Sequence, residues 1–311
     1  MTVERHKIVH MSEAHQLLRK GDITASKTGA LFDVHPYETR LKLFVEKSGV
    51  EFPTEETKTM RRGRWLEPTI GKAVSELRPD WTIEQANVYL RDPELRLGAT
   101  PDFFIIGDPR GLGVLQAKSV APSVYRRDWL DGTEPPLWIT LQCLTEMMLA
   151  DAAFGVIAAL LVDPHQMDCV LLDVPRNPSA EIKIVGAVCK FWKQVAAGEE
   201  PAADYGRDAA VIAALAPQEV AGKAIDLAGD NYLPDLLAQR AQLKARIKVD
   251  EERCEEIETE VKFKMRDAER IVGIDGWRVT FKTGDRAGYT VPPKKLRTLR
   301  ILDQRENMES S

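Results

Sequence analysis

The feature that most constrains this chain is a pair of short polar motifs, each beside an apolar run typical of a buried strand. Thr100-Pro101-Asp102 precedes the run at 103–106, and Gln116-Ala117-Lys118 follows the run at 112–115. Turn residues at 107–111 separate the two runs, so we expect a hairpin. Side chains two positions apart on a strand share a face, and the hairpin would bring Asp102, Gln116 and Lys118 to one edge of a sheet.

These residue types suit phosphodiester hydrolysis. That reaction needs a divalent cation, held by oxygen ligands, that neutralises charge on the phosphate and orients or acidifies a water molecule. Asp102 offers a carboxylate and Gln116 an amide oxygen. The amine of Lys118 can orient the attacking water or stabilise developing charge. Glu67, from a helix expected upstream, would complete the oxygen shell.

Hydrophobic periodicity predicts an α/β core with a central mixed sheet flanked by helices. After a helix near 12–20, a hydroxyl residue at 24–26 is expected to cap a new helix. A further helix is expected over 54–77, with Leu66, Ile70, Val74 and Leu77 on its apolar face, and an antiparallel meander over 81–119. The elements predicted beyond the meander are a helix at 136–150, strands at 155–162 and 169–174, and a helix at 180–197.

The composition changes after Glu199, which divides the chain into a core at 1–200 and a C-terminal appendage at 201–311. The appendage is expected to contain a linker, a long charged helix at 234–270 and a hairpin that pairs 276–282 with 289–291. It ends in a basic tail that includes Lys294, Lys295, Arg297 and Arg300.

Composition excludes several classes of protein. The formal charge of −5 argues mildly against a protein that coats nucleic acid, although an enzyme that grips DNA in a groove needs only local positive charge. The four cysteines form no CxxC pair, so neither a zinc site nor a disulfide framework is expected. No membrane span and no secretory signal are predicted, and we expect a cytoplasmic protein without a membrane partner.

Pro101-Asp102 followed by Gln116-x-Lys118 resembles the PD-(D/E)XK nuclease pattern. The wider layout, over roughly residues 10–200, resembles the YqaJ and lambda exonuclease family of phage recombination exonucleases. Three further pieces carry that resemblance in the same order. They are Leu18-Arg19-Lys20-Gly21-Asp22-Ile23-Thr24-Ala25-Ser26, Gly63-Arg64-Trp65-Leu66-Glu67-Pro68 and Leu141-Gln142. The resemblance implies a restriction-endonuclease-like core.

The resemblance also implies roles for individual residues. Lys118 matches the catalytic lysine, and Gln142 lies near a family glutamine beside the active site, although Thr140 could take the matching place. Met60 matches an apolar residue that wedges open the duplex end. The residues that match metal-binding positions are Glu67, Asp102, Gln116 and, through its carbonyl, Ala117. The residues that match a site for the terminal 5′-phosphate are Arg19 and Ser26.

A cluster of arginines lies beside Glu67 in the sequence, at Arg61, Arg62 and Arg64. Such a cluster is usually a solvated helix face. Next to a candidate metal ligand, contact with the DNA backbone is an equal alternative.

The implied activity is degradation of one strand of duplex DNA from its end, 5′ to 3′ and processively, with Mg2+ as the cofactor and Mn2+ as a possible substitute. The implied partners are double-stranded DNA ends, a single-strand annealing protein and two further copies of the chain in a ring-shaped trimer. The implied setting is a bacterial host cell, with the gene carried by a phage or prophage.

Position 116 departs from the family, which mostly has Glu there. A neutral amide attracts a cation less than a carboxylate does. Either Gln-x-Lys is a working site, as in Mrr-type nucleases, or Gln116 is a replacement of Glu that disables the enzyme. The second case leads to a different class, a catalytically weakened or inactive DNA-end-binding protein. A third reading is an assembly protein organised by the 234–270 helix.

Overall fold

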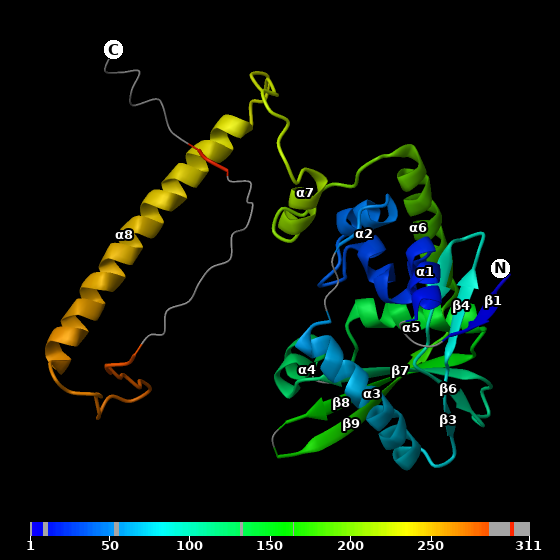
Figure 1. The fold of residues 1–311 in the computed structure, drawn as a ribbon. Coiled ribbons are helices and arrows are strands. Elements are labelled where there is room, and N and C mark those ends of the chain that lie inside the picture. The colour runs from blue at the N-terminus through cyan, green and yellow to red at the C-terminus, as the bar shows by residue number, and fades with distance from the viewer. Residues whose placement is uncertain are drawn as a thin grey trace. The chain divides into compact units, whose positions relative to one another are not determined.

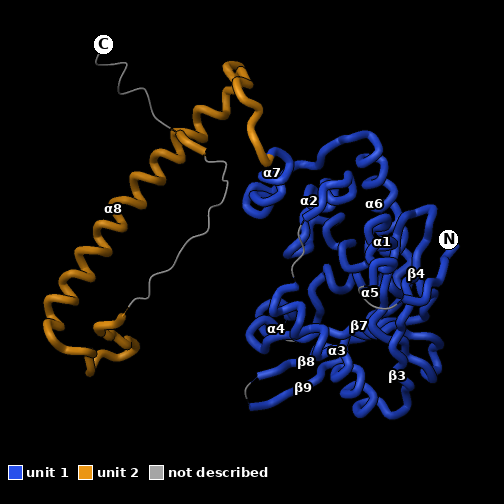
Figure 2. The backbone as a smooth tube through the Cα atoms, in the orientation of Figure 1, with its two compact units in different colours: residues 1–216 blue, residues 217–311 orange. Residues whose placement is uncertain are grey.

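The computed structural model describes residues 2–8, 12–52, 56–130, 133–163, 165–285 and 299–301. Its chain divides into two compact units, residues 1–216 and 217–311 (Figure 2). The first unit extends past the predicted boundary at 200, because α7 (Ala209–Leu215) packs on α2 (Arg40–Lys47). A hydrogen bond from Thr39, the N-cap of α2, to the buried carboxylate of Asp208 joins the two helices.

A five-stranded sheet forms the centre of the first unit. Its strands lie in the order β3 (Thr82–Gln85), β6 (Phe103–Ile106), β7 (Gly113–Val120), β8 (Phe154–Val162) and β9 (Met167–Pro175). β7 and β8 run parallel and the other neighbours run antiparallel, which confirms the predicted mixed sheet. The hairpin expected between the two polar motifs is the β6–β7 pair.

Helices cover both faces of this sheet (Figure 1). α3 (Lys58–Leu77) packs on one face through Ile70 and Val74, whereas Leu77, predicted on the same apolar face, is exposed. α5 (Leu137–Ala150) packs on the other face and is buried along nearly its whole length. Its close approach to β8 depends on Gly155, where a Cβ would lie 2.5 Å from Cys143 Sγ. The predicted arrangement of a mixed sheet flanked by helices is confirmed.

The antiparallel meander predicted over 81–119 is wrong, because its strands divide between two sheets. A second sheet has the order β1 (Glu4–Lys7), β4 (Val88–Asp92), β5 (Leu97–Ala99) and β2 (Ile23–Thr24). The chain leaves this sheet at Thr100-Pro101 and enters the central sheet at β6. Pro101 has no N–H to donate to a strand ladder, which favours a break between sheets at this position.

The segment after α1 (Glu13–Gly21) also differs from prediction. Thr24 belongs to β2 and does not cap a helix with its side chain. Its hydroxyl instead lies 3.1 Å from Ser26 Oγ. The helix that follows, η1 (Ala25–Phe32), is a 3-10 helix packed against α5. The remaining helices of this unit are α4 (Pro122–Asp128) and α6 (Pro178–Ala197).

The second unit contains α8 (Leu233–Met265), which confirms the long C-terminal helix but ends before the predicted residue 270. Arg266 leaves the helical conformation with φ 49° and ψ −109°. The predicted strand at 276–282 does not form; Thr280 instead makes an isolated antiparallel bridge with Arg270. Its predicted partner, 289–291, lies outside the described residues, as do Lys294, Lys295 and Arg297. None of the helices described has an apolar stretch that could cross a bilayer.

Candidate functional site

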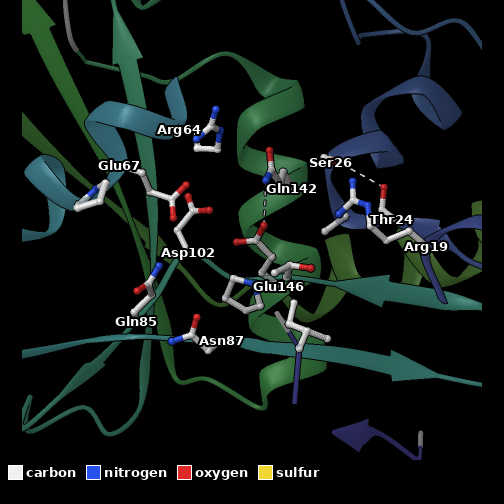
Figure 3. Close-up of a pocket in the computed structure, with 15 residues that line it drawn as sticks. Arg19, Thr24, Ser26, Arg64, Glu67, Gln85, Asn87, Asp102, Gln142 and Glu146 are labelled. Carbon is white, nitrogen blue, oxygen red and sulfur yellow. Dashed lines mark hydrogen bonds between the residues drawn. The ribbon is translucent and has the colours of Figure 1, made fainter. Parts of the chain in front are cut away.

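A cavity of about 410 Å³ lies in the first unit, where the central sheet, the second sheet, α3, α5 and η1 come together (Figure 3). Three carboxylates line it, from Glu67, Asp102 and Glu146, and two guanidinium groups, from Arg19 and Arg64. The remaining lining residues are mostly uncharged and polar. The cavity can therefore bring a cation and an anion together.

Each carboxylate is positioned by a different element. Glu67 lies in the middle of α3, Asp102 directly precedes β6, and Glu146 projects from α5. The labelled side chains in Figure 3 show the Glu67 and Asp102 carboxylates turned toward one another. Residues separated by long stretches of sequence thus share one cavity, which α3, α5 and the segment before β6 all line.

The β6–β7 hairpin anchors Asp102 to the Gln-x-Lys motif. Asp102 Oδ2 accepts hydrogen bonds from the backbone N–H of Ala117 at 2.8 Å and from Gln116 Nε2 at 2.5 Å. Gln116 and Lys118 both reach Gln142 on α5, as side chains two positions apart on a strand should. The predicted convergence of Asp102, Gln116 and Lys118 is therefore present.

Gln142 connects these groups in a directed series of hydrogen bonds. Lys118 Nζ donates to Gln142 Oε1 at 3.1 Å, and Gln142 Nε2 donates to Gln116 Oε1 at 2.8 Å and to Glu146 Oε1 at 2.9 Å. An ammonium group can only donate and a carboxylate can only accept. The ends of the series therefore determine the orientation of both amides, with each amide nitrogen pointing toward a carboxylate.

The surroundings raise the pKa of all three carboxyl groups. Burial, then the charge of Asp102, raises the pKa of Glu67 to about 7 although Lys118 opposes the shift. Burial raises the pKa of Asp102 despite the Lys118 charge and the two hydrogen bonds. Burial and the Asp102 charge raise the pKa of Glu146 well above its ordinary value. The protein's own cations therefore do not fully compensate these carboxylates, and an added cation would.

The donor set fits a hard divalent cation such as Mg2+, which prefers oxygen ligands and keeps several waters beside one or two carboxylates. Glu67 and Asp102 are the carboxylates that would hold it, with the Ala117 carbonyl at the adjoining strand position. In the part of the chain that the structure describes, no three His, Cys, Asp or Glu side chains already converge as a metal site. Cation binding would therefore depend on waters or on small side-chain movements.

The structure places some of the predicted DNA-binding residues at the cavity and others away from it. Arg19, Ser26 and Arg64 line the cavity, and burial lowers the pKa of the Arg19 guanidinium, a setting in which an anion is favoured. Met60, Arg61 and Arg62 do not line it. Met60 is 49% exposed on α3, and Arg61 pairs with Glu56 at 3.0 Å, as the solvated-face alternative expects.

Glu146 was not predicted from the sequence. It is the single charged residue in α5 and lies one helical turn after Gln142, on the same face. The sequence did contain a feature that could have indicated it, because Glu146 is the one carboxylate in a helix whose other residues are all uncharged. Gln85 and Asn87, which also line the cavity, follow no motif in the sequence.

Comparisons with known proteins find similar sequences and folds. The chain is 25% identical over 281 residues to a protein of Bacillus subtilis (strain 168) called YqaJ, covering 86% of this chain and 84% of that one. The fold is similar to that of an alkaline exonuclease from Laribacter hongkongensis, with TM-score 0.49 and 20% identity over 65% of this chain and 100% of that chain. A phage-related exonuclease from Haemophilus somnus 129PT gives TM-score 0.40 and 13% identity, covering 57% and 96%.

The family model of the YqaJ-like viral recombinase domain matches residues 14–153, from α1 to the turn before β8. That span includes Arg19, Glu67, Asp102, the Gln-x-Lys motif and α5, which together build the cavity and its hydrogen-bond series. Over this span, the chain is similar to YqaJ-like viral recombinases.

Proposed function

We propose that this protein is a metal-dependent DNA exonuclease that hydrolyses one strand of duplex DNA from its end, 5′ to 3′ and processively. The observation that carries the proposal is the cavity in which Glu67 and Asp102 face one another beside the Gln116-Ala117-Lys118 motif. Oxygen donors and an amine at one place are the groups that phosphodiester hydrolysis requires. The names of the similar exonucleases support the same activity.

In this proposal the oxygen of a water molecule bonds to phosphorus while the bond from phosphorus to the leaving sugar oxygen breaks. The water gives up a proton to solvent, and the sugar oxygen takes one from solvent to become a hydroxyl. A Mg2+ ion, or Mn2+ in its place, neutralises charge on the phosphate when bound. Glu67 and Asp102 would hold that ion. Gln142 lines the cavity and accepts a 3.1 Å hydrogen bond from Lys118 Nζ, and we propose that this ammonium group orients the attacking water or stabilises the developing negative charge.

Arg19 and Ser26 are proposed to bind the terminal 5′-phosphate. Both line the cavity, on the side away from Glu67 and Asp102 (Figure 3). An arginine donates paired hydrogen bonds to phosphate oxygens, and a hydroxyl adds one more. Arg64, which lines the cavity from α3 and pairs with Glu56, is proposed to contact a backbone phosphate in place of that carboxylate. The DNA strand would thus run between the α3 side of the cavity and the α1–η1 side.

The assembly and partners proposed for this activity follow from the family resemblance. They are a ring-shaped homotrimer around the DNA and a single-strand annealing protein that takes up the product strand, inside a bacterial host cell. Analytical ultracentrifugation of the full chain tests the trimer. The trimer is contradicted if the chain sediments as a monomer without DNA and as a single chain per duplex with DNA.

The activity is tested with linear duplex labelled at one 5′ end or at one 3′ end, incubated with the full chain with and without Mg2+. We expect early release of the 5′ label, later release of the 3′ label on the same strand, and no release with EDTA. Lys118→Met should abolish release. The matched control is Lys72→Met, which removes an exposed lysine from α3.

The second candidate, a DNA-end-binding protein without catalysis, is favoured by the neutral Gln116 at a position where the family mostly has Glu. Gln116→Glu separates the two. If the wild-type chain and Gln116→Glu both release nucleotides, Gln-x-Lys is a working site; if only Gln116→Glu does, this chain is a disabled nuclease. If neither releases nucleotides but both retard end-labelled duplex on a native gel, end binding replaces the exonuclease proposal.

A further inference from the structure

Glu146 is a charged residue in a place where charge is costly. Its side chain lies within α5 at 1% exposure, surrounded by the apolar core on one side and the cavity on the other. A buried carboxylate is stable only if charged or hydrogen-bonding partners replace the water it has lost. Its partners therefore indicate what the site is built to hold.

The two oxygens of Glu146 differ. Oε1 accepts the 2.9 Å hydrogen bond from Gln142 Nε2. Oε2 is buried and has no hydrogen-bond partner among the residues that the structure describes. Figure 3 shows the carboxylate reaching from α5 into the cavity that Asp102 and Glu67 also line. A carboxylate oxygen in this position is available to a bound cation or to a water molecule on that cation.

Gln116 shows the opposite arrangement. Both ends of its amide are occupied, since Nε2 donates to Asp102 and Oε1 accepts from Gln142. Gln116 is 2% exposed and does not line the cavity. It therefore connects two other side chains and offers neither a charge nor an unoccupied oxygen to a ligand.

Gln142 donates through the same nitrogen to Gln116 and to Glu146. These two side chains thus approach one point from β7 and from α5. A carboxylate at either position would add one negative charge to the same small volume beside Asp102. The chain has its carboxylate on α5 and its amide on the strand.

We propose that Glu146 supplies the cation-binding carboxylate that position 116 lacks, so that the divalent cation of this protein is held by Asp102, Glu67 and Glu146, directly or through bound water. This inference rests on the proposed function, because it assigns a ligand to the cation of that reaction. It also accounts for a neutral residue at 116 in a working site. The site then has three carboxylates, as it would with Glu at position 116, but the third comes from α5 and not from β7.

Direct titration of Mn2+ into the cation-free full chain tests the assignment, with free Mn2+ measured by its paramagnetic resonance signal. Glu146→Gln should lower the affinity for Mn2+ about tenfold or more. A loss of about tenfold is the lower end of what is found when residues that support the metal ligands are changed. Glu76→Gln is the matched control, since it removes an exposed carboxylate from the end of α3. It should leave the affinity unchanged.

A rescue variant separates a ligand from a residue that only supports the fold. In Gln116→Glu combined with Glu146→Gln, the carboxylate returns to the strand beside the same Gln142 nitrogen. We expect this double variant to recover most of the lost Mn2+ affinity. A purely structural role for Glu146 predicts no recovery, together with a lower melting temperature of the Glu146→Gln variant.

The outcomes distinguish this inference from the proposed function. Mn2+ affinity equal to wild type in Glu146→Gln overturns the assignment of Glu146, and so does a loss that Gln116→Glu does not recover. If the wild-type chain still releases nucleotides with Mg2+ in either case, the exonuclease proposal stands. If the wild-type chain neither binds Mn2+, with or without duplex DNA, nor releases nucleotides, both proposals fail.

Discussion

The charged groups of the cavity and those of α8 show two different uses of charge. Around the cavity, the buried side chains of Gln116, Gln142 and Glu146 are joined with the half-buried Asp102 in one series of hydrogen bonds. Along α8, charges are exposed and pair locally, as in the ion pair of Lys262 with Glu258, 3.4 Å apart and four residues apart in the sequence. The first arrangement holds polar groups away from water, and the second leaves them in it.

The difference indicates where to look for function. Exposed pairs at helical spacing contribute little stability and mainly keep a helix soluble. Buried polar groups cost free energy unless they are fully paired, and a buried oxygen without a partner therefore needs an explanation such as a ligand. The charge-rich α8 carries no such group among its described residues, whereas the cavity carries Glu146 Oε2.

The largest effect expected within this comparison comes from Asp102→Asn. Asp102 joins the hairpin to the cavity and is a proposed cation ligand, so nuclease activity should fall by at least about 100-fold, the upper end of the loss seen for supporting residues of metal sites. Release of labelled nucleotides measures it. Asp80→Asn removes an exposed aspartate and serves as the control. Activity within a few-fold of wild type in Asp102→Asn would exclude Asp102 from the reaction.

A smaller effect is expected at the opposite side of the cavity. Arg19→Ala removes a guanidinium group proposed to bind the terminal phosphate, and a charge-assisted hydrogen bond contributes enough to expect about a tenfold loss. The loss should appear on duplex with a 5′-phosphate and be nearly absent on duplex with a 5′-hydroxyl. An equal loss on both substrates would assign Arg19 to general stability of the fold instead.

Glu146→Gln should affect stability in the direction opposite to its effect on cation binding. Without divalent cations, the buried carboxylate has an oxygen with no partner, and an amide of the same shape is less costly to bury. We expect the melting temperature at pH 8 with EDTA to rise by about 2–4 °C, which corresponds to roughly 1 kcal/mol. A fall in melting temperature would show that the carboxylate itself stabilises the cation-free fold.

Glu46 is an intermediate case between the buried series and the exposed pairs. Burial alone raises the pKa of Glu46, but the charges and hydrogen bonds of Lys27 and Lys47 outweigh burial and leave the pKa below its ordinary value of 4.5. The ionised carboxylate therefore stabilises the fold at pH values above 4.5. This contribution disappears as the pH falls through the lowered pKa.

Glu46→Gln should accordingly lower the melting temperature at pH 7 by about 1–2 °C. The difference from wild type should shrink as the pH falls below 4.5. Thermal unfolding followed by circular dichroism over this pH range measures both. A difference that grows on acidification would contradict the lowered pKa.

The smallest effect is expected on α8. Glu260→Gln removes the exposed partner of Lys264, and it should leave the melting temperature unchanged because solvent and salt already screen this pair. Unfolding followed in low and high salt measures it. A clear, salt-independent destabilisation would show that this part of α8 lies in a contact between copies of the chain.

Local sequence pattern determined much of what positions the site. The two-residue period of β7 places Gln116 and Lys118 on one face, and the turn at 107–111 pairs β6 with β7. The apolar period of α3 places Ile70 and Val74 on the sheet and Glu67 beside them. These features are predictable because each depends on residues close together in the sequence.

The tertiary structure alone decided two further features. The strands over 82–106 divide between two sheets, because pairing of β4 with β1 and of β3 with β6 depends on partners distant in the sequence. Glu146 belongs to the cavity only because α5 crosses β7 and β8 with that face toward Asp102. Periodicity predicts which residues of a helix share a face, but the packing of the whole core determines what that face contacts.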